Sequence, residues 1–198
     1  MPNWCSNVMV VYGSPTEVKD FYDKVKKAWS IGDENKHWHL WEIYQQFGHE
    51  DKEMVEYIRG YFEDITSIKG LSPNESCFKL YYESAWSPMI DGFDWILKTY
   101  YKTLKQETLA EECGCDIYVN TDTSRRFFKE KYSLYIEDYD TFYCASDEEL
   151  VKEFNKFSKQ KAKNAKDCFD IVEKNDGSII STIKNVEHYV SLNEFGTW

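Results

Sequence analysis

The stretch Asn7-Val-Met-Val-Val-Tyr-Gly-Ser-Pro-Thr-Glu17 decides the fold, because it holds the end of a strand and the start of a helix. Residues 7–12 form a short β-branched run that a glycine ends. Ser14 then occupies an N-cap position, Pro15 the first helical position and Glu17 the third. The stretch predicts a βα unit whose helix begins at Pro15.

Apolar side chains recur at helical spacing after Pro15, and they give one stripe that can pack on a sheet. This stripe consists of Val18, Phe21, Tyr22, Val25 and Trp29.

Two more strands are predicted at residues 59–68 and 77–83, joined by the turn-forming residues 70–74. A helix through residues 54–65 is the alternative. Residues 30–58 mix strand-like and helical patterns, and we treat them as an insertion.

Ser87-Pro88 is a second pair of N-cap and proline, and it is followed by apolar residues at helical intervals. It predicts the second core helix. Residues 106–113 supply a fourth strand. Beyond a turn at Gly114, residues 115–119 and 131–137 are further extended segments and predict an added hairpin.

Ser146-Asp-Glu-Glu149 is a capping box that predicts a lysine-rich helix over residues 147–163. Extended segments at residues 169–173 and 178–183 flank Asn175-Asp-Gly177, which is a strong hairpin-turn signal.

These elements predict an α+β protein with a ferredoxin-like βαββαβ core, an added hairpin, a C-terminal helix and a small β appendage. The length of 198 residues suits one core with an appendage. We therefore expect a ferredoxin-like domain over residues 1–145, with the insertion at 30–58, and a C-terminal helix and β-hairpin over residues 146–198.

Composition limits the classes of partner. The N-terminal apolar run is too short for a signal peptide or a membrane span, so we expect a cytoplasmic protein whose six cysteines are reduced.

The net charge of −11 disfavours direct binding of nucleic acid, because affinity for phosphates comes from clustered Lys and Arg. The negative charge indicates either a basic partner or no more than solubility.

Motifs of catalysis are missing from the sequence. There is no nucleophile elbow, glycine-rich phosphate loop or zinc-protease helix signature, so we predict a non-enzymatic protein without a cofactor. Cys113-Gly-Cys115 offers only two thiols, and His37 and His39 lack a partner at a diagnostic spacing. We predict no metal site.

Three motifs, Met1-Pro-Asn-Trp-Cys-Ser-Asn7, Glu83-Ser-Ala-Trp-Ser-Pro88 and the run from Glu111 to Asp122, together resemble the YubB-type ferredoxin-like family of plasmid and phage proteins. The resemblance covers residues 1 to about 140, and it implies a ferredoxin-like fold in a protein of a mobile element. It implies no activity. The chain departs from the family pattern at Ser124-Arg-Arg126 and Lys129.

The leading hypothesis, which rests on this resemblance, is a protein that inhibits a host defence component, such as a CRISPR effector, through an acidic surface. Lys156, Lys159 and Lys163 are the predicted partner contacts outside the family-like region.

The alternative is a small-ligand protein that binds or sequesters a nucleotide-like base. Trp4 and Trp86 would line its pocket, and Glu83 or Glu111 would orient the ligand. A third hypothesis is a symmetric homodimer formed through an exposed sheet edge or through the apolar side of the helix at residues 147–163.

Overall fold

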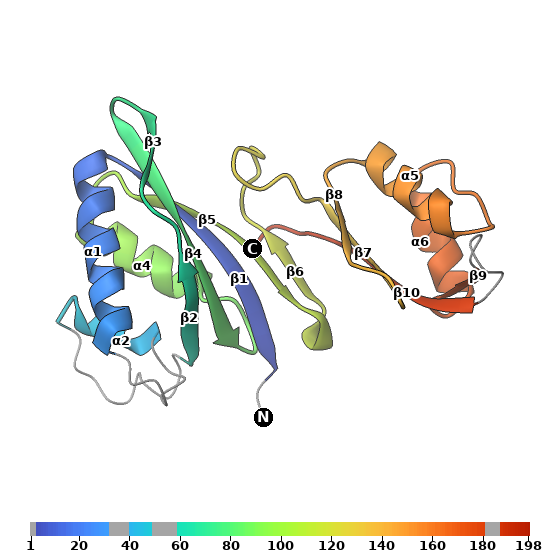
Figure 1. Ribbon diagram of the computed structural model, residues 1–198, viewed down its shortest axis with the longest axis horizontal. Coiled ribbons are helices and arrows are strands. Elements are labelled where there is room, and N and C mark those ends of the chain that lie inside the picture. Colours follow the sequence, from blue (N-terminus) through green and yellow to red (C-terminus); the bar gives the residue numbers. More distant parts are fainter. Residues whose placement is uncertain (1–2, 32–39, 49–58, 181–186) are drawn as a thin grey trace. The chain divides into compact units, whose positions relative to one another are not determined.

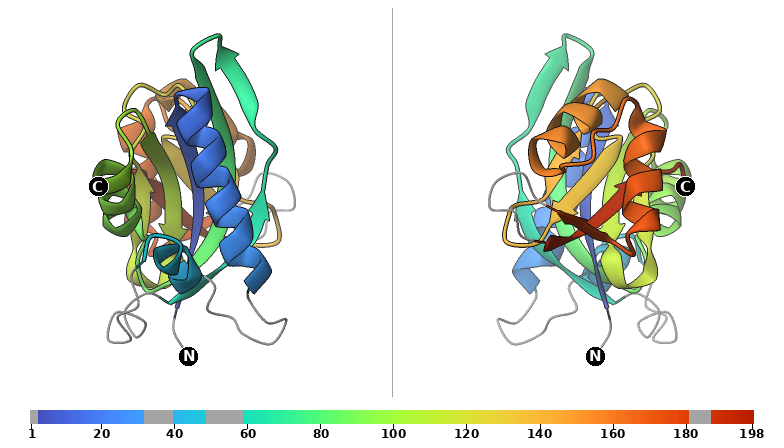
Figure 2. Two further views of the ribbon diagram at one scale, coloured as in Figure 1. Left: turned by 90° about the vertical axis from the view of Figure 1, so that its left-hand side faces the viewer. Right: turned by 90° about the vertical axis from the view of Figure 1, so that its right-hand side faces the viewer.

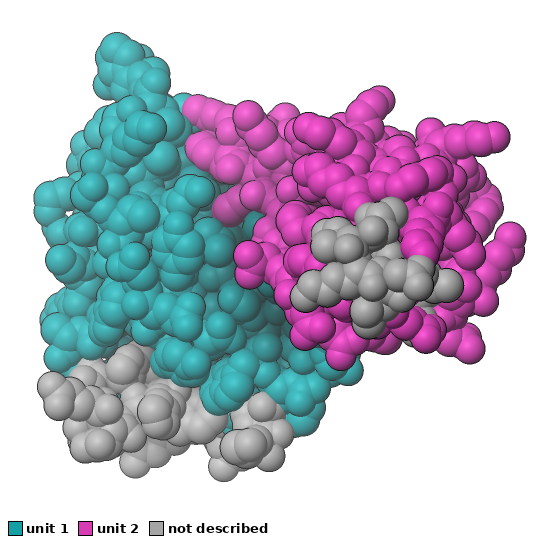
Figure 3. Space-filling view, turned by 45° about the vertical axis from the view of Figure 1, so that its right-hand side comes forward, with its two compact units in different colours: residues 1–122 teal, residues 123–198 magenta. Residues whose placement is uncertain are grey.

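The computed structural model divides into two compact units, residues 1–122 and 123–198 (Figure 3). Each unit has its own antiparallel sheet, so the chain is an α+β protein. The division falls earlier than the boundary expected after residue 145, and strands at residues 132–144 belong to the second unit. The structure describes residues 3–31, 40–48, 59–180 and 187–198.

Unit 1 is a sheet with its long helices on one face (Figures 1 and 2). The strand order is β2-β4-β1-β5-β6, every one of these pairs is antiparallel, and β3 also pairs with β4. Strand β1 is central and β4 and β5 flank it. The elements are β1 Trp4–Gly13, α1 Pro15–Ile31, α2 Leu40–Gln45, β2 Gly60–Ile65, β3 Lys69–Ser72, β4 Glu75–Ala85, α4 Ile90–Tyr100, β5 Lys105–Glu112, the 3-10 turn η1 Cys113–Cys115 and β6 Ile117–Asn120.

The core of unit 1 confirms the βα unit expected from residues 7–17. Met9 and Val11 are fully buried on the helix side of β1, and they belong to one core cluster with Val18, Phe21 and Val25 of α1. This arrangement follows from the two periodicities, because alternate strand residues share a face and the helical stripe covers that face.

The second core helix begins later than predicted. Its N-cap is Met89, which makes no side-chain capping bond, and α4 starts at Ile90 rather than at Pro88. The carbonyl oxygen of Ser87 accepts a hydrogen bond from the Ser84 hydroxyl (2.8 Å), and the Ser87 N–H donates to the carbonyl of Ala85 (3.0 Å). Ser87 therefore belongs to the turn that ends β4.

Three other predictions in unit 1 are refined. Residues 60–65 form a strand, not the alternative helix, although residues 54–58 lie outside the described residues. Within the predicted insertion, residues 40–45 form α2. The predicted turn at residues 70–74 is shorter, because β3 continues to Ser72.

Unit 2 has the strand order β8-β7-β10-β9. Buried residues of α5 and α6 share a core cluster with buried residues of the four strands. The elements are β7 Tyr132–Ile136, β8 Phe142–Cys144, α5 Asp147–Phe157, α6 Ala165–Lys174, β9 Ser178–Ile180 and β10 Glu187–Glu194.

Three predictions for the C-terminal part were wrong. Residues 115–119 and 131–137 do not form a hairpin, because β6 pairs with β5 and β7 pairs with β8 and β10. The lysine-rich helix ends at Phe157 rather than at residue 163. Residues 169–173 are part of helix α6 instead of a strand.

Asn175-Asp-Gly177 ends α6 rather than connecting two strands. Asn175 is the C-cap, and the Gly177 N–H donates to the carbonyl of Val172 (2.9 Å). Gly177 has a φ of +77°, a left-handed conformation that is common for glycine after a helix. The strand that pairs with β9 is β10, at residues 187–194.

No helix in the described ranges combines the length and the apolar character needed to cross a membrane.

Candidate functional site

The three sequence motifs meet at one end of the sheet in unit 1. The first motif lies at the start of β1, the second runs from the end of β4 into the following turn, and the third runs from the end of β5 through η1 and β6. Strand β1 lies between β4 and β5. Ser6 of β1 is directly opposite Glu83 of β4 and Glu111 of β5. Two of the predicted ligand-binding carboxylates therefore flank one serine on neighbouring strands, about 4.8 Å from strand to strand.

The same cross-strand row continues to both edges of the sheet. Tyr61 of β2 is opposite Glu83, and Tyr118 of β6 is opposite Glu111. Residues directly opposite one another in a sheet share a face, so these side chains lie together on the face away from the core. We call Tyr61, Glu83, Ser6, Glu111 and Tyr118 the acidic row.

A β-bulge in β2 brings a further carboxylate to this region. The pairing of β2 with β4 shifts between Phe62 and Asp64, so that Glu63 has no opposite residue. Phe62 is buried in the core, whereas Glu63 and Asp64 are both exposed. Because a bulge interrupts the alternation of side chains, two successive acidic residues can lie outside the core next to the acidic row.

The predicted tryptophans lie beside the acidic row, nearer the end of the sheet. Trp4 is opposite Ala85, two residues beyond Glu83, and its ring contacts Tyr61 edge to face with 5.3 Å between centroids. Trp86 follows Ala85 with a φ of +73° and is about half exposed. The backbone N–H of Trp86 donates a hydrogen bond to the carbonyl of Asn3 (2.8 Å).

The electrostatics of the row centre on Glu83. Partial burial raises the pKa of this carboxyl, and the negative charges of Glu63 and Glu111 raise it further. The hydrogen bond from the Ser6 hydroxyl opposes these effects. Burial, and then the charges of Glu83 and Glu63, also raise the pKa of Tyr61. A perturbed carboxyl among like charges is a common property of functional sites.

A buried amide supports the strands beneath the row. The Asn7 side chain donates to the carbonyls of Cys5 (2.6 Å) and Tyr82 (3.3 Å) and to the Ser84 hydroxyl (2.9 Å). The Cys5 thiol is buried on the same side, and burial, followed by the charge of Glu83, raises its pKa to about 12. Cys5 is therefore a protonated packing residue and a poor nucleophile at neutral pH.

The Cys113-Gly-Cys115 pair forms the η1 turn between β5 and β6. Both thiols are exposed, and the Glu112 carboxylate accepts a hydrogen bond from the Gly114 N–H (2.9 Å). A hydrogen bond to Glu112 raises the pKa of Cys115. Among the described residues, no group of three or more His, Cys, Asp or Glu side chains could hold a metal ion. His37 and His39 lie outside these residues.

The predicted partner-binding lysines do not lie on one helix. Lys156 is in α5, whereas Lys159 and Lys163 follow it in the connection to α6. Lys156 forms an ion pair with Glu153 (2.6 Å). The predicted basic helix face is therefore divided between a helix and a loop.

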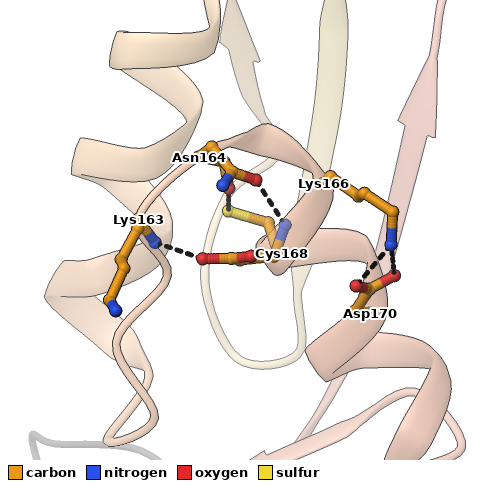
Figure 4. A network of polar contacts seen from close by, with 6 residues as sticks. Lys163, Asn164, Lys166, Cys168 and Asp170 are labelled. Carbon is orange, nitrogen blue, oxygen red and sulfur yellow. Dashed lines mark hydrogen bonds and ion pairs between the residues drawn. The ribbon is translucent and has the colours of Figure 1, made fainter.

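Figure 4 shows the second half of this region, at the start of α6. Lys163 takes part through its backbone N–H, which donates to the Asp167 carboxylate (2.8 Å). The Asn164 side chain caps the helix by accepting from the Asp167 N–H (2.9 Å), and Lys166 forms an ion pair with Asp170 (2.6 Å). These contacts fix the helix start, which is a structural role.

Sequence reasoning missed Ser6, Tyr61 and Tyr118. Strand register positions each of them, and it pairs Ser6 and Tyr61 with residues 22 to 105 positions away, whereas Tyr118 is only 7 positions from Glu111. Ser6 could have been predicted from the sequence, because it lies in the first motif, two residues after Trp4 on the same face of the strand.

The chain was compared with models of protein families, with curated proteins and with solved structures, and none of the three comparisons found a match.

Proposed function

We propose that this chain is a non-enzymatic binding protein whose acidic row holds a basic surface of a partner protein. The observation that carries the proposal is the environment of Glu83, a carboxyl with a raised pKa beside Glu63 and Glu111. Bringing like charges together on a sheet is unfavourable in the free protein. A cation supplied by a partner would relieve this repulsion, so the row is arranged for binding more than for stability.

The distribution of charge supports the same proposal. Residues 1–122 contain 21 of the 35 acidic side chains and 12 of the 24 basic ones, whereas residues 123–198 contain 14 and 12. The excess negative charge therefore belongs mainly to unit 1, which carries the acidic row. A field of one sign speeds the approach of an oppositely charged partner, and salt weakens it.

We also propose that unit 1 is a ferredoxin-like domain of the YubB type. Its support is the strand order β2-β4-β1-β5 with α1 and α4 in the connections, together with the meeting of the three motifs on adjacent strands. That resemblance makes a host defence component, such as a CRISPR effector with a basic nucleic-acid groove, the first partner to test.

The test uses a panel of purified CRISPR effector proteins and the full chain, with affinities measured by surface plasmon resonance at low and high salt. We expect binding to at least one effector, a weaker complex at high salt, and at least a tenfold loss for the double variant Glu83→Gln/Glu111→Gln, because charged contacts at an interface contribute about 1.5 kcal/mol or more each.

A matched variant locates the contact. Lys156→Glu/Lys159→Glu/Lys163→Glu changes the charge of unit 2 and leaves the acidic row intact. If this triple variant loses binding and the double variant does not, the partner surface is the lysine segment and not the row. If no effector binds, or if the complex is insensitive to salt, inhibition of such a component is excluded as the function.

The second candidate is a protein that binds a nucleotide-like base, and the Trp4–Tyr61 ring pair beside Glu83 favours it. Aromatic rings can stack on a base and a carboxyl can accept from its N–H groups. Native mass spectrometry with added nucleosides should then show a stoichiometric complex that Trp4→Leu abolishes. A spectrum that contains only the 23.6 kDa chain under these conditions would rule this candidate out.

A further inference from the structure

The six cysteines of the chain differ in their access to solvent. Cys113 and Cys115 are exposed. The other four are buried, and they are Cys5, Cys77, Cys144 and Cys168. Burial raises the pKa of Cys5 to about 12 and the pKa values of Cys144 and Cys168 to about 11. Because the thiolate is the reactive form of cysteine, reactions with small molecules are directed to the two exposed thiols.

A single glycine separates the two exposed thiols in the η1 turn. Because a 3-10 turn rises only about 2 Å per residue, its Cα atoms two positions apart stay within the roughly 4.4–6.8 Å that a disulfide spans. A Cβ atom at Gly114 would lie 2.6 Å from Nδ2 of Asn3 and 2.9 Å from Oε1 of Glu112. The same Asn3 amide donates to Sγ of Cys115 (3.8 Å). The glycine therefore allows two polar side chains to pack directly against the turn that carries the thiols.

The carboxylate at this turn is buried and incompletely hydrogen-bonded. The Glu112 side chain is only 6% exposed, and its Oε1 accepts from the Gly114 N–H (2.9 Å). Its Oε2 is buried and has no hydrogen-bond partner in the part of the chain that the structure describes. The Cys115 thiol interacts with the same carboxylate, which raises the pKa of Cys115. An unsatisfied buried acceptor is unfavourable, so Glu112 is well placed to take a proton from this thiol.

Cys113 has a donor for a neighbour instead of an acceptor. Its side chain forms a hydrogen bond with Tyr118, and this bond contributes, after burial, to the raised pKa of the tyrosine. The Tyr118 hydroxyl is therefore the donor, and an ionised sulfur accepts such a bond more strongly than a neutral one. The two thiols thus suit different steps of one reaction, with Cys113 as the attacking thiolate and Cys115 as the thiol that reacts second.

We infer that Cys113 and Cys115 form a redox-active pair, which is oxidised to a reversible disulfide by exchange with low-molecular-weight disulfides such as oxidised glutathione. The inference goes beyond the proposed function and requires no protein partner. Cytosolic disulfides are usually transient and catalytic or redox-sensing, and a pair that is reduced at rest fits that class.

The exchange takes two steps. The Cys113 thiolate attacks one sulfur of the small disulfide, which forms a mixed disulfide and releases one small thiolate that takes up the proton lost by Cys113. Cys115 then gives its proton to Glu112 and attacks the Cys113 sulfur, so that the bond between the two cysteines forms and the second small thiolate leaves. The proton on Glu112 passes to that leaving thiolate. In total, two protein thiols lose two electrons and two protons, and one small disulfide becomes two thiols.

The experiment maps the products on the full chain. The protein is treated with oxidised glutathione, quenched with acid and alkylated with iodoacetamide in denaturant, and its peptides are identified by mass spectrometry. We expect a bond between Cys113 and Cys115, with the four buried cysteines alkylated. Treatment with dithiothreitol should restore alkylation of all six.

Three variants assign the steps. Cys115→Ser should accumulate one glutathione on Cys113, because no second thiol can displace it. Cys113→Ser should slow the formation of any adduct at least tenfold. Glu112→Gln should form the mixed disulfide at the normal rate but convert it into the internal disulfide at least tenfold more slowly, because the proton acceptor is lost.

Asp116→Asn is the matched control, because Asp116 is an exposed carboxyl next to Cys115 and its left-handed backbone also suits asparagine. It should leave both rates unchanged, and circular dichroism should show the same fold for all variants. Stable glutathione adducts on both exposed cysteines of the unaltered chain, or no reaction at either one, would overturn the inference. So would internal disulfide formation in Glu112→Gln at the rate of the unaltered chain.

Discussion

The acidic row of unit 1 and the lysine-rich segment of unit 2, which we define as residues 146–170, show two ways in which a protein arranges charge. In the lysine-rich segment, Lys156 and Lys166 each form an ion pair with a carboxylate three or four positions away on the same helix. In the acidic row, Glu83 and Glu111 come from different strands, and the charge of Glu111 contributes to the raised pKa of Glu83. The two ion pairs are local, whereas the carboxylates of the acidic row meet through long-range strand pairing.

The difference indicates which kind of charge cluster is the better candidate for a binding site. A run of charges along the sequence is conspicuous, yet pairs at helical spacing neutralise it at a gain of only a few tenths of a kcal/mol each. Like charges that meet across strands are inconspicuous in the sequence. They cost free energy in the free protein, so they are better candidates for contact with a partner.

The largest expected effect is the loss of stability when Gly60, which packs closely against β4 beside the acidic row, is replaced by alanine. A Cβ atom added at Gly60 would overlap the carbonyl oxygen of Glu83 and the side chain of Leu40. Because neither the strand nor the buried leucine can move freely, Gly60→Ala should lower the free energy of unfolding by about 1–3 kcal/mol. Urea denaturation measures this loss.

Gly70→Ala is the control, because a Cβ at Gly70 meets nothing within 4 Å. It should change stability by less than about 0.5 kcal/mol. Equal losses for the two variants would mean that the cost comes from glycine replacement as such and not from the close approach at Gly60.

A smaller effect is expected in the lysine-rich segment. The Ser146 side chain accepts a hydrogen bond from the Glu149 N–H (3.3 Å) at the start of α5, so Ser146→Ala should lower the free energy of unfolding by about 1 kcal/mol. Ser87→Ala is the comparison, since Ser87 does not cap α4. Thermal denaturation should show a lower Tm only for Ser146→Ala, and a comparable loss at Ser87 would contradict the observed start of α4.

The smallest expected effect is the change in stability when one glutamate is replaced by glutamine. We expect this change to have opposite signs in the acidic row and in the lysine-rich segment. The pKa of Glu83 is raised in the folded protein, so the folded state binds the proton more tightly and ionisation destabilises it. This penalty appears as the pH rises through the ordinary titration range of a glutamate, so it is present at about pH 7 and absent at about pH 3, below that range. Glu83→Gln should therefore stabilise the protein at about pH 7, by less than about 1 kcal/mol for this partly exposed group, and the gain should vanish at about pH 3.

Glu153→Gln removes the partner of Lys156 and should have the opposite sign. It should destabilise the protein at about pH 7 by a few tenths of a kcal/mol. Denaturation curves at the two pH values measure both variants. A loss of stability in Glu83→Gln at neutral pH would show that Glu83 is compensated in the folded protein.

The fold of unit 1 was predictable where local and tertiary preferences agree. Residues 7–17 combine a β-branched run, a glycine and a capped helix start, and the structure has β1 ending at Gly13 and α1 starting at Pro15. The capping box at Ser146 also marked a real helix start. In these cases the residues that specify an element lie within the element itself.

The predictions failed where one local signal serves two structures. Asn175-Asp-Gly177 suits a hairpin turn because such turns need positive φ angles at two residues. Asp176 and Gly177 do have φ angles of +49° and +77°, but they follow helix α6. The packing of Ala165 and Cys168 into the core and the Asn164 cap favour the helix, and neither is visible in the turn residues.

The candidate site was predictable only in part. The motifs pointed to Trp4, Glu83, Trp86 and Glu111, and the structure brings three of these to two adjacent rows of one face, with Trp86 in the turn beside them. Tyr61 could not be found from the sequence, because its place beside Glu83 depends on the register and bulge of β2.

The left-handed backbone of Trp86 affects which substitutions the chain can accept at this position. A left-handed backbone costs an ordinary L residue about 1–2 kcal/mol, whereas glycine adopts it freely. The half-exposed indole recovers only part of that cost by burial. Mutational drift under selection for folding alone would therefore carry this position toward glycine. A tryptophan there is what a trade-off predicts when a side chain is selected for what it contacts outside its own fold.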